Sequence, residues 1–339
     1  MFNFVTSIYP VQKSNIIDSF YQLGQALLEI PEATKEKAQI MNPWFTQTFI
    51  QLSAKNWADA LSKEKIEFWL KDETCELREQ TLGIIMAGNI PLVGLHDLLA
   101  GIAKGLKVSI KLSSSDEVLM TYAIEKLIEF CPELKNRINT EGKLNGIQYL
   151  IATGSNNSAR YFEYYFKDVP SLIRKNRTSI AVLNGNEDEA ALVRLADDIY
   201  SYYGLGCRNV SHLILPKGFE LRPLYEAYDV YMDHVNHHKY YNNYMYHKSI
   251  LLMNLDKHYD NGFMLFQEKQ APHAPIATLN YHYYEHIDEV HTYLEQNLEQ
   301  WQCIASDMPE LKQAVALGQT QKPGLADYAD NVNLLEFLS

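Results

Sequence analysis

Short apolar runs alternate with amphipathic stretches over residues 81–215 of this chain. A short apolar run bounded by Gly, Asn or Ser is typical of a buried strand, and apolar positions three and four residues apart are typical of a helix. Strands separated by helices of this length indicate βαβ units and parallel sheets covered on both faces. The expected strands are 83–87, 108–112, 148–152, 179–183 and 210–215, and the expected helices are 92–103, 115–130, 158–166 and 187–203.

The two ends of the chain show a different pattern. Residues 1–80 carry apolar positions at helical spacing, with Pro31 and Pro43 between the helical pieces. Beyond residue 216 helical stretches predominate, and the tail from 319 has no clear period before Leu334. Here we expect helices over 16–28, 52–70, 219–235, 237–252 and 287–298, and a strand over 275–280. The whole pattern predicts an α/β protein with a helical N-terminal segment and two α/β/α domains whose sheets are mostly parallel.

Composition and charge exclude several classes of protein. The chain has 339 residues, 47% of them hydrophobic, which is ample for one large or two ordinary domains. Its net charge of -12 argues against general nucleic-acid binding, which needs a basic surface. No apolar run approaches the ~18 residues that span a bilayer, and the first residues lack the basic and apolar regions of a signal peptide. We therefore expect a soluble protein with neither a nucleic-acid partner nor a membrane span.

Four cysteines, Cys75, Cys131, Cys207 and Cys303, show no paired metal-ligand spacing and no dense disulfide framework. This usage is typical of a reducing compartment, so we expect a cytoplasmic protein. Histidine is dense between His234 and His258, but no HExxH pattern occurs and many tyrosines are interleaved. We expect no metal site there, but a solvated or interfacial aromatic-rich helix. The absence of a GxSxG pattern disfavours a serine hydrolase.

Cys207 is the candidate nucleophile. It lies in Gly204-Leu-Gly-Cys207-Arg-Asn-Val-Ser, between an amphipathic helical stretch and an apolar strand. A glycine-rich loop exposes backbone N–H groups and lets another molecule approach closely, and a thiol attacks only as its thiolate. The alternative is a structural cysteine, which is the interpretation we give to the other three.

Two kinds of loop follow the strands of the first half. Asn89, in the turn Ala87-Gly-Asn89-Ile-Pro91, offers a side-chain amide to a developing oxyanion, although asparagine also simply tolerates turns. Lys111 with Ser113, and Thr153-Gly-Ser155, each end a strand and open a helix, an arrangement suited to a phosphate or a ribose. The three-glycine Rossmann fingerprint and the P-loop are both absent.

The turn cluster Asn184-Gly-Asn186 is the expected domain boundary. Residues 1–183 would form a cofactor-binding domain with the helical N-terminal segment, and 184–318 a catalytic domain carrying Cys207. Residues 319–339 would form a C-terminal tail that packs back or takes part in oligomerisation.

The order of these segments resembles the aldehyde dehydrogenase superfamily. The segments are Ile84-Ile-Met-Ala-Gly-Asn-Ile-Pro-Leu92, Val108-Ser-Ile-Lys-Leu-Ser113, Thr153-Gly-Ser155 and Gly206-Cys207. Within that family the chain is most similar to the acyl-CoA reductase branch, typified by the fatty-acid reductase of bacterial luminescence. The stretches Met86–Gly94, Lys111–Ser114 and Leu325-Ala-Asp-Tyr328-Ala-Asp330 fit that branch. The similarity covers roughly residues 40–339 and implies an aldehyde dehydrogenase-like fold.

The resemblance assigns a role to each candidate residue. Cys207 would be the acylated nucleophile, and Asn89 would bind the oxyanion together with the Cys207 backbone N–H. Lys111 and Ser113 would contact the adenosine ribose, and Gly154 and Ser155 the pyrophosphate. Dehydrogenases of the family have a glutamate where this chain has Ser114. Its loss removes repulsion of a 2′-phosphate, which favours NADPH, with NADH possible.

Two carboxylates of the family have no clear counterpart. The hydrolytic glutamate would fall near Ile173-Arg174, where this chain has no carboxylate. Without a base to activate water, a thioacyl enzyme should survive to meet hydride. The glutamate that holds the nicotinamide ribose cannot be placed, although Glu268 is near.

The sequence therefore predicts NADPH-dependent reduction of a fatty acyl-CoA, or another acyl thioester, to the aldehyde through a thioacyl-cysteine. One alternative is an NAD(P)-dependent aldehyde dehydrogenase that forms the acid. Another is a non-catalytic, partner-binding subunit of the same fold, which would use its Tyr- and His-rich surface. The resemblance also implies an acyl-activating synthetase as a partner, and we expect a homo-oligomer.

Overall fold

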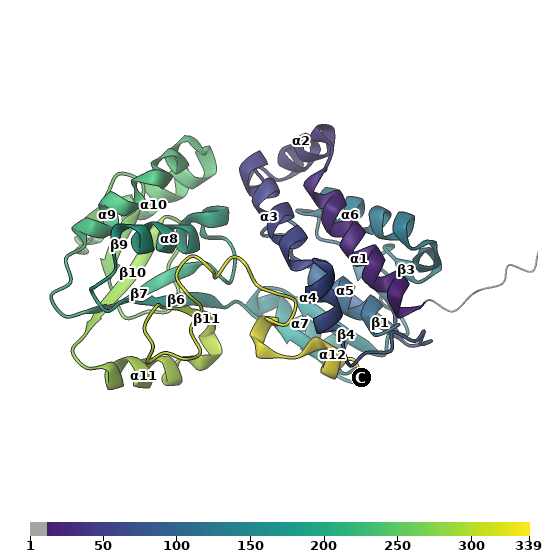
Figure 1. Ribbon diagram of the computed structural model, residues 1–339. Coiled ribbons are helices and arrows are strands. Elements are labelled where there is room, and N and C mark those ends of the chain that lie inside the picture. Colours follow the sequence, from purple (N-terminus) through teal and green to yellow (C-terminus); the bar gives the residue numbers. More distant parts are fainter. Residues whose placement is uncertain (1–11) are drawn as a thin grey trace, which may run out of the picture. The chain divides into compact units, whose positions relative to one another are not determined.

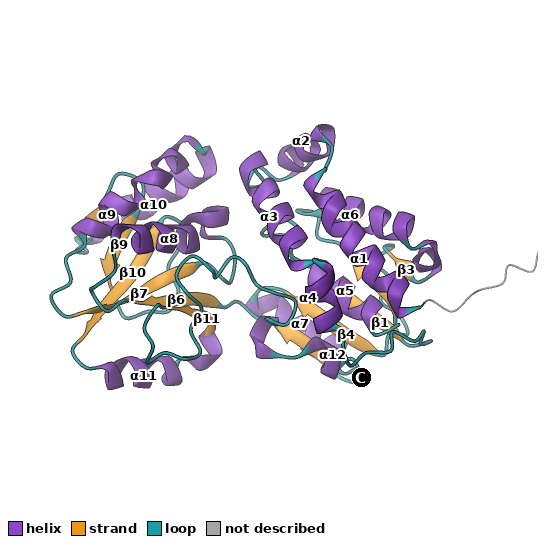
Figure 2. Ribbon diagram, viewed as in Figure 1, coloured by secondary structure: helices purple, strands orange, loops and turns teal. Residues whose placement is uncertain are grey.

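The computed structural model of the chain describes residues 12–339, which divide into two compact units (Figure 1). Unit 1 comprises the described residues up to Lys175 together with Gly324–Ser339, and unit 2 comprises Asn176–Pro323. Each unit is a sheet with helices packed against it (Figure 2).

The sheet of unit 1 has five strands in the order β3-β2-β1-β4-β5, and all neighbouring strands are parallel. Because β1 pairs with β2 on one side and with β4 on the other, the chain reverses its direction of winding between β1 and β4. This is the order of doubly wound nucleotide-binding sheets, whose ligands sit beyond the carboxyl ends of the strands at such a reversal. The strands are β1 Thr81–Ile85, β2 Lys107–Lys111, β3 Ile138–Asn139, β4 Tyr149–Thr153 and β5 Ser171–Arg174.

Helices cover both faces of this sheet. Leu82 and Ile84 point into a large core with α1, whose Phe20 and Leu23 are fully buried. On the other face Leu150 packs with partly buried side chains of α7 and the segment after it. The helices are α1 Lys13–Leu28, α2 Glu32–Met41, α3 Gln47–Ala60, α4 Lys63–Trp69, α5 Leu95–Ala103, α6 Glu117–Phe130, α7 Asn156–Tyr165 and α12 Leu334–Phe337, with 3-10 turns at Pro132–Asn136 and Ala329–Asn331.

The sheet of unit 2 has six strands in the order β11-β6-β7-β10-β9-β8, parallel except for the antiparallel pair β8–β9. Side chains along β6 alternate between two cores: Ala181 belongs to the core with α8 and α9, and Ile180 and Val182 to the core with α11. Figure 1 shows α8 and α9 over one face and α11 over the other. The strands are β6 Thr178–Val182, β7 Val210–Pro216, β8 Tyr259–Asp260, β9 Leu265–Glu268, β10 Thr278–Tyr284 and β11 Trp301–Ala305. The helices are α8 Glu189–Tyr200, α9 Arg222–Tyr228, α10 His238–Asn254 and α11 Ile287–Gln296, with 3-10 segments η2 Ser201–Gly204, η3 Asp229–Asn236 and η4 Leu298–Gln300.

Two expectations about organisation need correction. The division falls at 175/176 rather than at 183/184, because β6 pairs with β7 and β11 and so belongs to the second sheet. The helix expected over 52–70 is two helices, because α3 ends at Ala60 and Ser62 takes the N-cap position of α4. The tail from Gly324 joins unit 1, where Leu334 and Leu338 are fully buried.

Within residues 12–339, no helix combines the length and the apolar character needed to cross a bilayer.

Candidate active site

The carboxyl edge of the unit 1 sheet gathers five of the six candidate residues. Asn89 follows β1, Lys111 ends β2 with Ser113 just after it, and Gly154 and Ser155 follow β4. Because β2, β1 and β4 are adjacent and parallel, these loops leave the same edge of the sheet. The reversal of winding between β1 and β4 places the Asn89 and Gly154 loops on either side of the crevice where such sheets bind ligands.

The turn that carries Asn89 is held by neighbouring segments, while Asn89 itself is exposed. Gly88 packs against Ser113, and a Cβ at position 88 would come within 2.8 Å of the Ser113 Cβ. The Pro91 carbonyl accepts a hydrogen bond from the Ser53 hydroxyl (2.8 Å), and the Leu92 N–H donates to Asp116 Oδ2 (2.8 Å). The Asn89 turn and the Ser113 loop therefore pack against each other.

The loop after β2 presents polar groups to solvent. Lys111 and Ser114 are exposed, and Ser113 is half-buried with its hydroxyl accepting from the Ser115 N–H (3.3 Å). Helix α6 begins directly after this loop, at Glu117. A ribose at this edge would meet a lysine and a hydroxyl, and no carboxylate at position 114.

The loop after β4 opens α7. Ser155 caps this helix, because its hydroxyl accepts from the Ser158 N–H (3.2 Å). Gly154 lies close to the helix: a Cβ there would come within 3.0 Å of the Ser158 Cβ and 3.1 Å of the Phe162 ring. A glycine followed by a helix N-terminus is the arrangement that lets backbone N–H groups meet a phosphate.

At the end of β5, near the position that the resemblance implies for a hydrolytic glutamate, the structure has a buried ion pair. The Arg174 guanidinium contacts the Asp97 carboxylate on α5, Nη1 to Oδ2 at 2.8 Å and Nη2 to Oδ1 at 2.9 Å. The side chains of Arg174 and Asp97 retain 11% and 5% of their accessible surface. Position 174 thus carries a buried guanidinium that is paired with a carboxylate, and the side chain of Ile173 beside it is apolar.

Cys207 lies in unit 2, in the turn between η2 and β7, at the amino-terminal end of β7. It is exposed, whereas Cys75 and Cys131 are buried and Cys303 is half-buried. Three successive residues before it, Tyr202, Tyr203 and Gly204, have φ between 54° and 76°, which redirects the chain out of α8 into this turn. Two non-glycine residues in the left-handed region mark a strained segment of the kind that clusters at functional sites.

Asn209 organises the Cys207 turn from the inside. Its Oδ1 accepts from the Gly206 N–H (2.8 Å), and its Nδ2 donates to the Ser201 carbonyl (2.6 Å). Its side chain is buried, with 2% exposure of the residue. One buried amide therefore joins the two ends of the loop and leaves Cys207 at the outside.

Ser179 on β6 connects the turn to a second thiol. Its hydroxyl lies 3.1 Å from the Cys207 carbonyl oxygen and 3.0 Å from Cys303 Sγ on β11. Burial raises the pKa of Cys303 to about 11, against the lowering effect of Arg208, the neighbour of Cys207. The neighbourhood of Cys207 therefore contains an arginine and a second thiol that stays protonated at neutral pH.

In the histidine-rich segment between 234 and 258, His234 and His237 pack against an aromatic ring. The rings of His234 and His237 lie 4.6 Å and 4.5 Å from the ring of Tyr203. Burial lowers the pKa of His234 to about 4. Among the described residues, no group of three His, Cys, Asp or Glu side chains is arranged to hold a metal ion.

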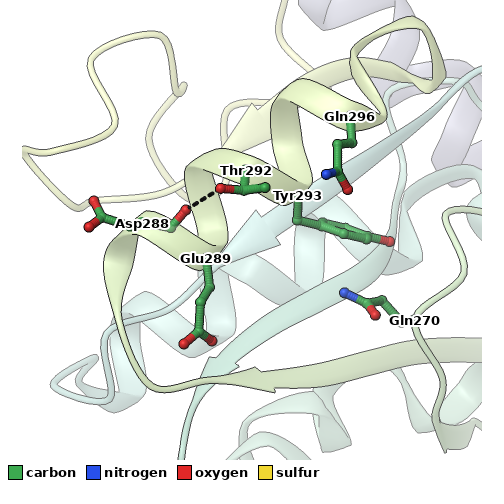
Figure 3. A pocket seen from close by; sticks show the side chains of 6 residues that line it. All are labelled: Gln270, Asp288, Glu289, Thr292, Tyr293 and Gln296. Carbon is green, nitrogen blue, oxygen red and sulfur yellow. Dashed lines mark hydrogen bonds between the residues drawn. The ribbon is translucent and has the colours of Figure 1, made fainter.

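Two hollows in unit 2 differ in their chemistry. The larger, of about 410 Å³, lies between α11 and the segment after β9; its lining includes Asp288, Glu289 and Gln270 but none of the predicted site residues (Figure 3). The smaller, of about 30 Å³, is lined by Tyr203, Gly204 and Asn209 of the Cys207 loop together with Pro275 and Ile276. Only the second hollow touches the loop of the candidate nucleophile, and neither is lined by Cys207 itself.

Glu268, which lies near the position of the family's nicotinamide-ribose glutamate, ends β9 and is exposed.

Sequence reasoning missed the residues that hold these loops. These residues include Ser53, Asp97 and Asp116, none of which a local sequence pattern singles out. A buried polar residue that acts across a long sequence separation leaves no periodic signal, since its partner is set by the fold.

Comparison with models of protein families finds no match for this chain, and neither does comparison with curated proteins. Comparison with solved structures finds an acetylating aldehyde dehydrogenase from Geobacillus thermoglucosidasius (TM-score 0.64, 11% identity, 96% of this chain and 90% of that one). It also finds a P. syringae indole-3-acetaldehyde dehydrogenase in complex with NAD+ and IAA (TM-score 0.63, 11% identity, 90% and 74%). A third is the propionaldehyde dehydrogenase of a Clostridium phytofermentans fucose utilisation bacterial microcompartment (TM-score 0.61, 9% identity, 90% and 86%). The chain therefore has an aldehyde dehydrogenase-like α/β fold.

Proposed function

We propose that this protein reduces an acyl thioester, such as a fatty acyl-CoA, to the aldehyde with NADPH. The observation that carries the proposal is the exposure of Cys207, alone among the four cysteines, in a turn fixed by a buried asparagine. An exposed thiol beside an arginine is the setting in which a cysteine acts as a nucleophile. The fold shared with acetylating aldehyde dehydrogenases supports acyl and aldehyde chemistry.

In the proposed reaction the Cys207 thiolate forms a bond to the thioester carbonyl carbon. As the resemblance to the aldehyde dehydrogenase superfamily implies, the Asn89 amide and the Cys207 backbone N–H would donate hydrogen bonds to the resulting oxyanion, each stabilising the transition state by about 3 kcal/mol. The bond to the CoA sulfur then breaks, CoA leaves as its thiol after taking up a proton, and the acyl group remains on Cys207. A nicotinamide cofactor held by the residues at the carboxyl edge of the unit 1 sheet would supply the hydride that reduces this thioester. The Cys207 thiolate is the leaving group as the aldehyde forms.

The residues at the carboxyl edge of the unit 1 sheet suit a dinucleotide. In the proposal Lys111 and Ser113 contact the adenosine ribose, and Gly154 and Ser155 the pyrophosphate at the start of α7. The close approach of Gly154 to α7 supports this assignment, because a larger residue would displace Ser158 or Phe162. The exposed Ser114 carries no charge against a 2′-phosphate, which favours NADPH over NADH.

The buried Arg174–Asp97 pair supports reduction over acid formation. A guanidinium held at 2.8 Å by a carboxylate cannot serve as a general base for water, and Ile173 has no titratable group. The acid-forming dehydrogenase is therefore the less favoured enzyme.

One separate observation supports a partner-binding role. Large apolar and aromatic side chains of η3, α10 and the residue after it are exposed, among them Met232, Tyr246, Met253 and Leu255. Such a surface suits a protein partner. We propose an acyl-activating synthetase or a second copy of the chain, and a cytoplasmic setting, as the context of the reaction.

The decisive experiment is mass spectrometry of the intact protein after exposure to a panel of acyl-CoAs without NADPH. We expect one acyl adduct, on Cys207, and release of aldehyde when NADPH is added. Cys207→Ala should lose both the adduct and turnover while still binding NADPH, and the neighbouring Cys303→Ala should keep both. Turnover by Cys207→Ala, or an adduct on another cysteine, would exclude the mechanism.

A further inference from the structure

We propose that Asp116 is a positioning residue for this reaction: it fixes the turn that presents Asn89 to the developing oxyanion. The inference rests on the proposed function and names a residue that acts through Asn89 without touching the substrate.

The first observation is where the Asp116 side chain goes. Asp116 occupies the N-cap position of α6, yet its side chain makes no capping bond to that helix. Its Oδ2 instead accepts from the Leu92 N–H at 2.8 Å, three residues after Asn89. An aspartate at an N-cap normally accepts from the second or third N–H of its own helix. Here that interaction is replaced by the hydrogen bond from Leu92, directly after the turn that carries Asn89.

The second observation is the conformation that this bond stabilises. Leu92 has a φ of 60° and is fully buried. A bulky residue in the left-handed region is strained, and it persists only where its surroundings determine it. The Asp116–Leu92 bond is a direct restraint on that peptide group, so it fixes the direction in which the turn enters α5.

The third observation is that the turn is tethered at other points as well. The Ser53 hydroxyl donates to the Pro91 carbonyl at 2.8 Å. Gly88 packs against Ser113, and a Cβ at position 88 would come within 3.1 Å of the Asp116 backbone nitrogen. The backbone on both sides of Asn89 is thus held, whereas the Asn89 side chain is exposed. This is the preorganisation that a hydrogen-bond donor to an oxyanion needs.

The state of the carboxyl group fits this role. Burial raises the pKa of Asp116 well above its ordinary value, and the bond from Leu92 opposes the rise only in part. Its Oδ1 is buried without a hydrogen-bond partner among the described residues. A carboxyl group whose pKa is raised restrains the turn while carrying less negative charge near an oxyanion or a phosphate than an ordinary aspartate would.

The test compares Asp116→Ala, Asp116→Asn and Asp188→Ala in the full chain. Asp188 is the matched control, because it is the N-cap of α8 and does cap its own helix, accepting from the Ala191 N–H at 2.7 Å. We expect Asp116→Ala to lower kcat about 10- to 100-fold and to change KM for acyl-CoA less than about threefold. Asp116→Asn keeps an acceptor for the Leu92 N–H and should retain kcat within about threefold. Asp188→Ala should lower only stability.

Two further variants separate positioning from folding. Ser53→Ala loosens the same turn from the other side and should lower kcat in the same direction while the chain stays folded. In an Asn89→Ala background, Asp116→Ala should lower kcat little further, because residues that act as one unit are not additive. A full additional loss in that background, or wild-type kcat in a folded Asp116→Ala, would overturn the role of Asp116. Failure of the wild-type protein to form any acyl-Cys207 adduct would instead overturn the proposed function.

Discussion

The Arg174 guanidinium and the Asp97 carboxylate meet through two parallel hydrogen bonds of 2.8 and 2.9 Å, both side chains being almost completely buried. This pair joins the edge strand β5 to α5, the helix that follows the Asn89 turn. The contact therefore ties the last strand of the unit 1 sheet to the elements that carry the candidate site.

Arg174→Ala should lower the free energy of unfolding by about 3–5 kcal/mol, because it leaves the Asp97 charge buried and unpaired. Lys175→Ala is the matched control: Lys175 pairs with Glu163 at 2.9 Å, but the two side chains are 56% and 49% exposed. Such a surface pair contributes about 0–1 kcal/mol. Denaturant unfolding of both variants measures the difference, and equal losses would contradict the structural role of the Arg174 pair.

Gly88→Ala should destabilise the protein, because its Cβ would come within 2.8 Å of the Ser113 Cβ and 3.1 Å of the Asp116 backbone nitrogen. We expect a loss of about 1–3 kcal/mol. Adding Ser113→Gly removes the clash and should restore part of that stability, but not cofactor binding if Ser113 contacts the ribose. Gly324→Ala, whose Cβ would meet only an ordinary contact at 3.4 Å, serves as the control in the same thermal unfolding assay.

A thiol alkylator near neutral pH should label Cys207 before any other cysteine. Cys207 is exposed, whereas burial raises the pKa of Cys131 and of Cys303 to about 11 and that of Cys75 above its ordinary value. Because the thiolate is the reactive form, we expect at least about a tenfold difference in rate. Peptide mapping during a time course measures it. Labelling of all four at similar rates would favour the non-catalytic alternative.

The stability of the fold should fall as the pH is lowered from about 6.5 to about 4. His212 Nδ1 lies 2.8 Å from the Ala271 carbonyl oxygen, and its Nε2 lies 2.6 Å from His282 Nδ1, with Tyr293 and Trp301 beside the pair. Burial lowers the pKa of both histidines to about 4. Since the unfolded chain binds protons first, the contribution is complete above about pH 6.5 and is lost as the pH falls.

The measurement is the free energy of unfolding at several pH values for the wild type and His282→Gln. The glutamine donates to His212 but does not titrate. The slope of the free energy of unfolding against pH, between about pH 4 and 6.5, should therefore decrease by the equivalent of up to about one bound proton. His291→Gln, at an exposed position of α11, should leave the slope unchanged. A wild-type slope retained in His282→Gln would refute the assignment.

Ser114→Glu should weaken binding of NADPH more than binding of NADH. The exposed side chain at 114 follows β2, and a carboxylate there would repel a 2′-phosphate, whereas it accepts hydrogen bonds from a free ribose. We expect a shift in the ratio of the two dissociation constants of at least about tenfold, measured by titration of cofactor fluorescence. Ser115→Glu, one residue further and also exposed, provides the control. An unchanged ratio in Ser114→Glu would count against the proposed ribose site.

The alternation of apolar runs determined the central strands and the helices between them. Expected strands at 108–112, 148–152 and 210–215 correspond to β2, β4 and β7 within one residue at every end, because these strands are buried on both faces. The strands that sequence reasoning missed lie mainly at the sheet edges: β3 and β5 in unit 1, β8 and β11 in unit 2. An edge strand is paired on one side only and is partly exposed, so it needs no continuous apolar run.

The sequence by itself also placed the polar loops after β1, β2 and β4 and singled out Cys207, since these signals are local combinations of Gly, Asn and Ser with apolar runs. Only the tertiary structure decided which side chains support those loops. Asp116 meets Leu92 across 24 residues, Arg174 meets Asp97 across 77, and Ser179 meets Cys303 across 124. Pairings over such separations follow from strand order and helix packing, which no local pattern of residues specifies.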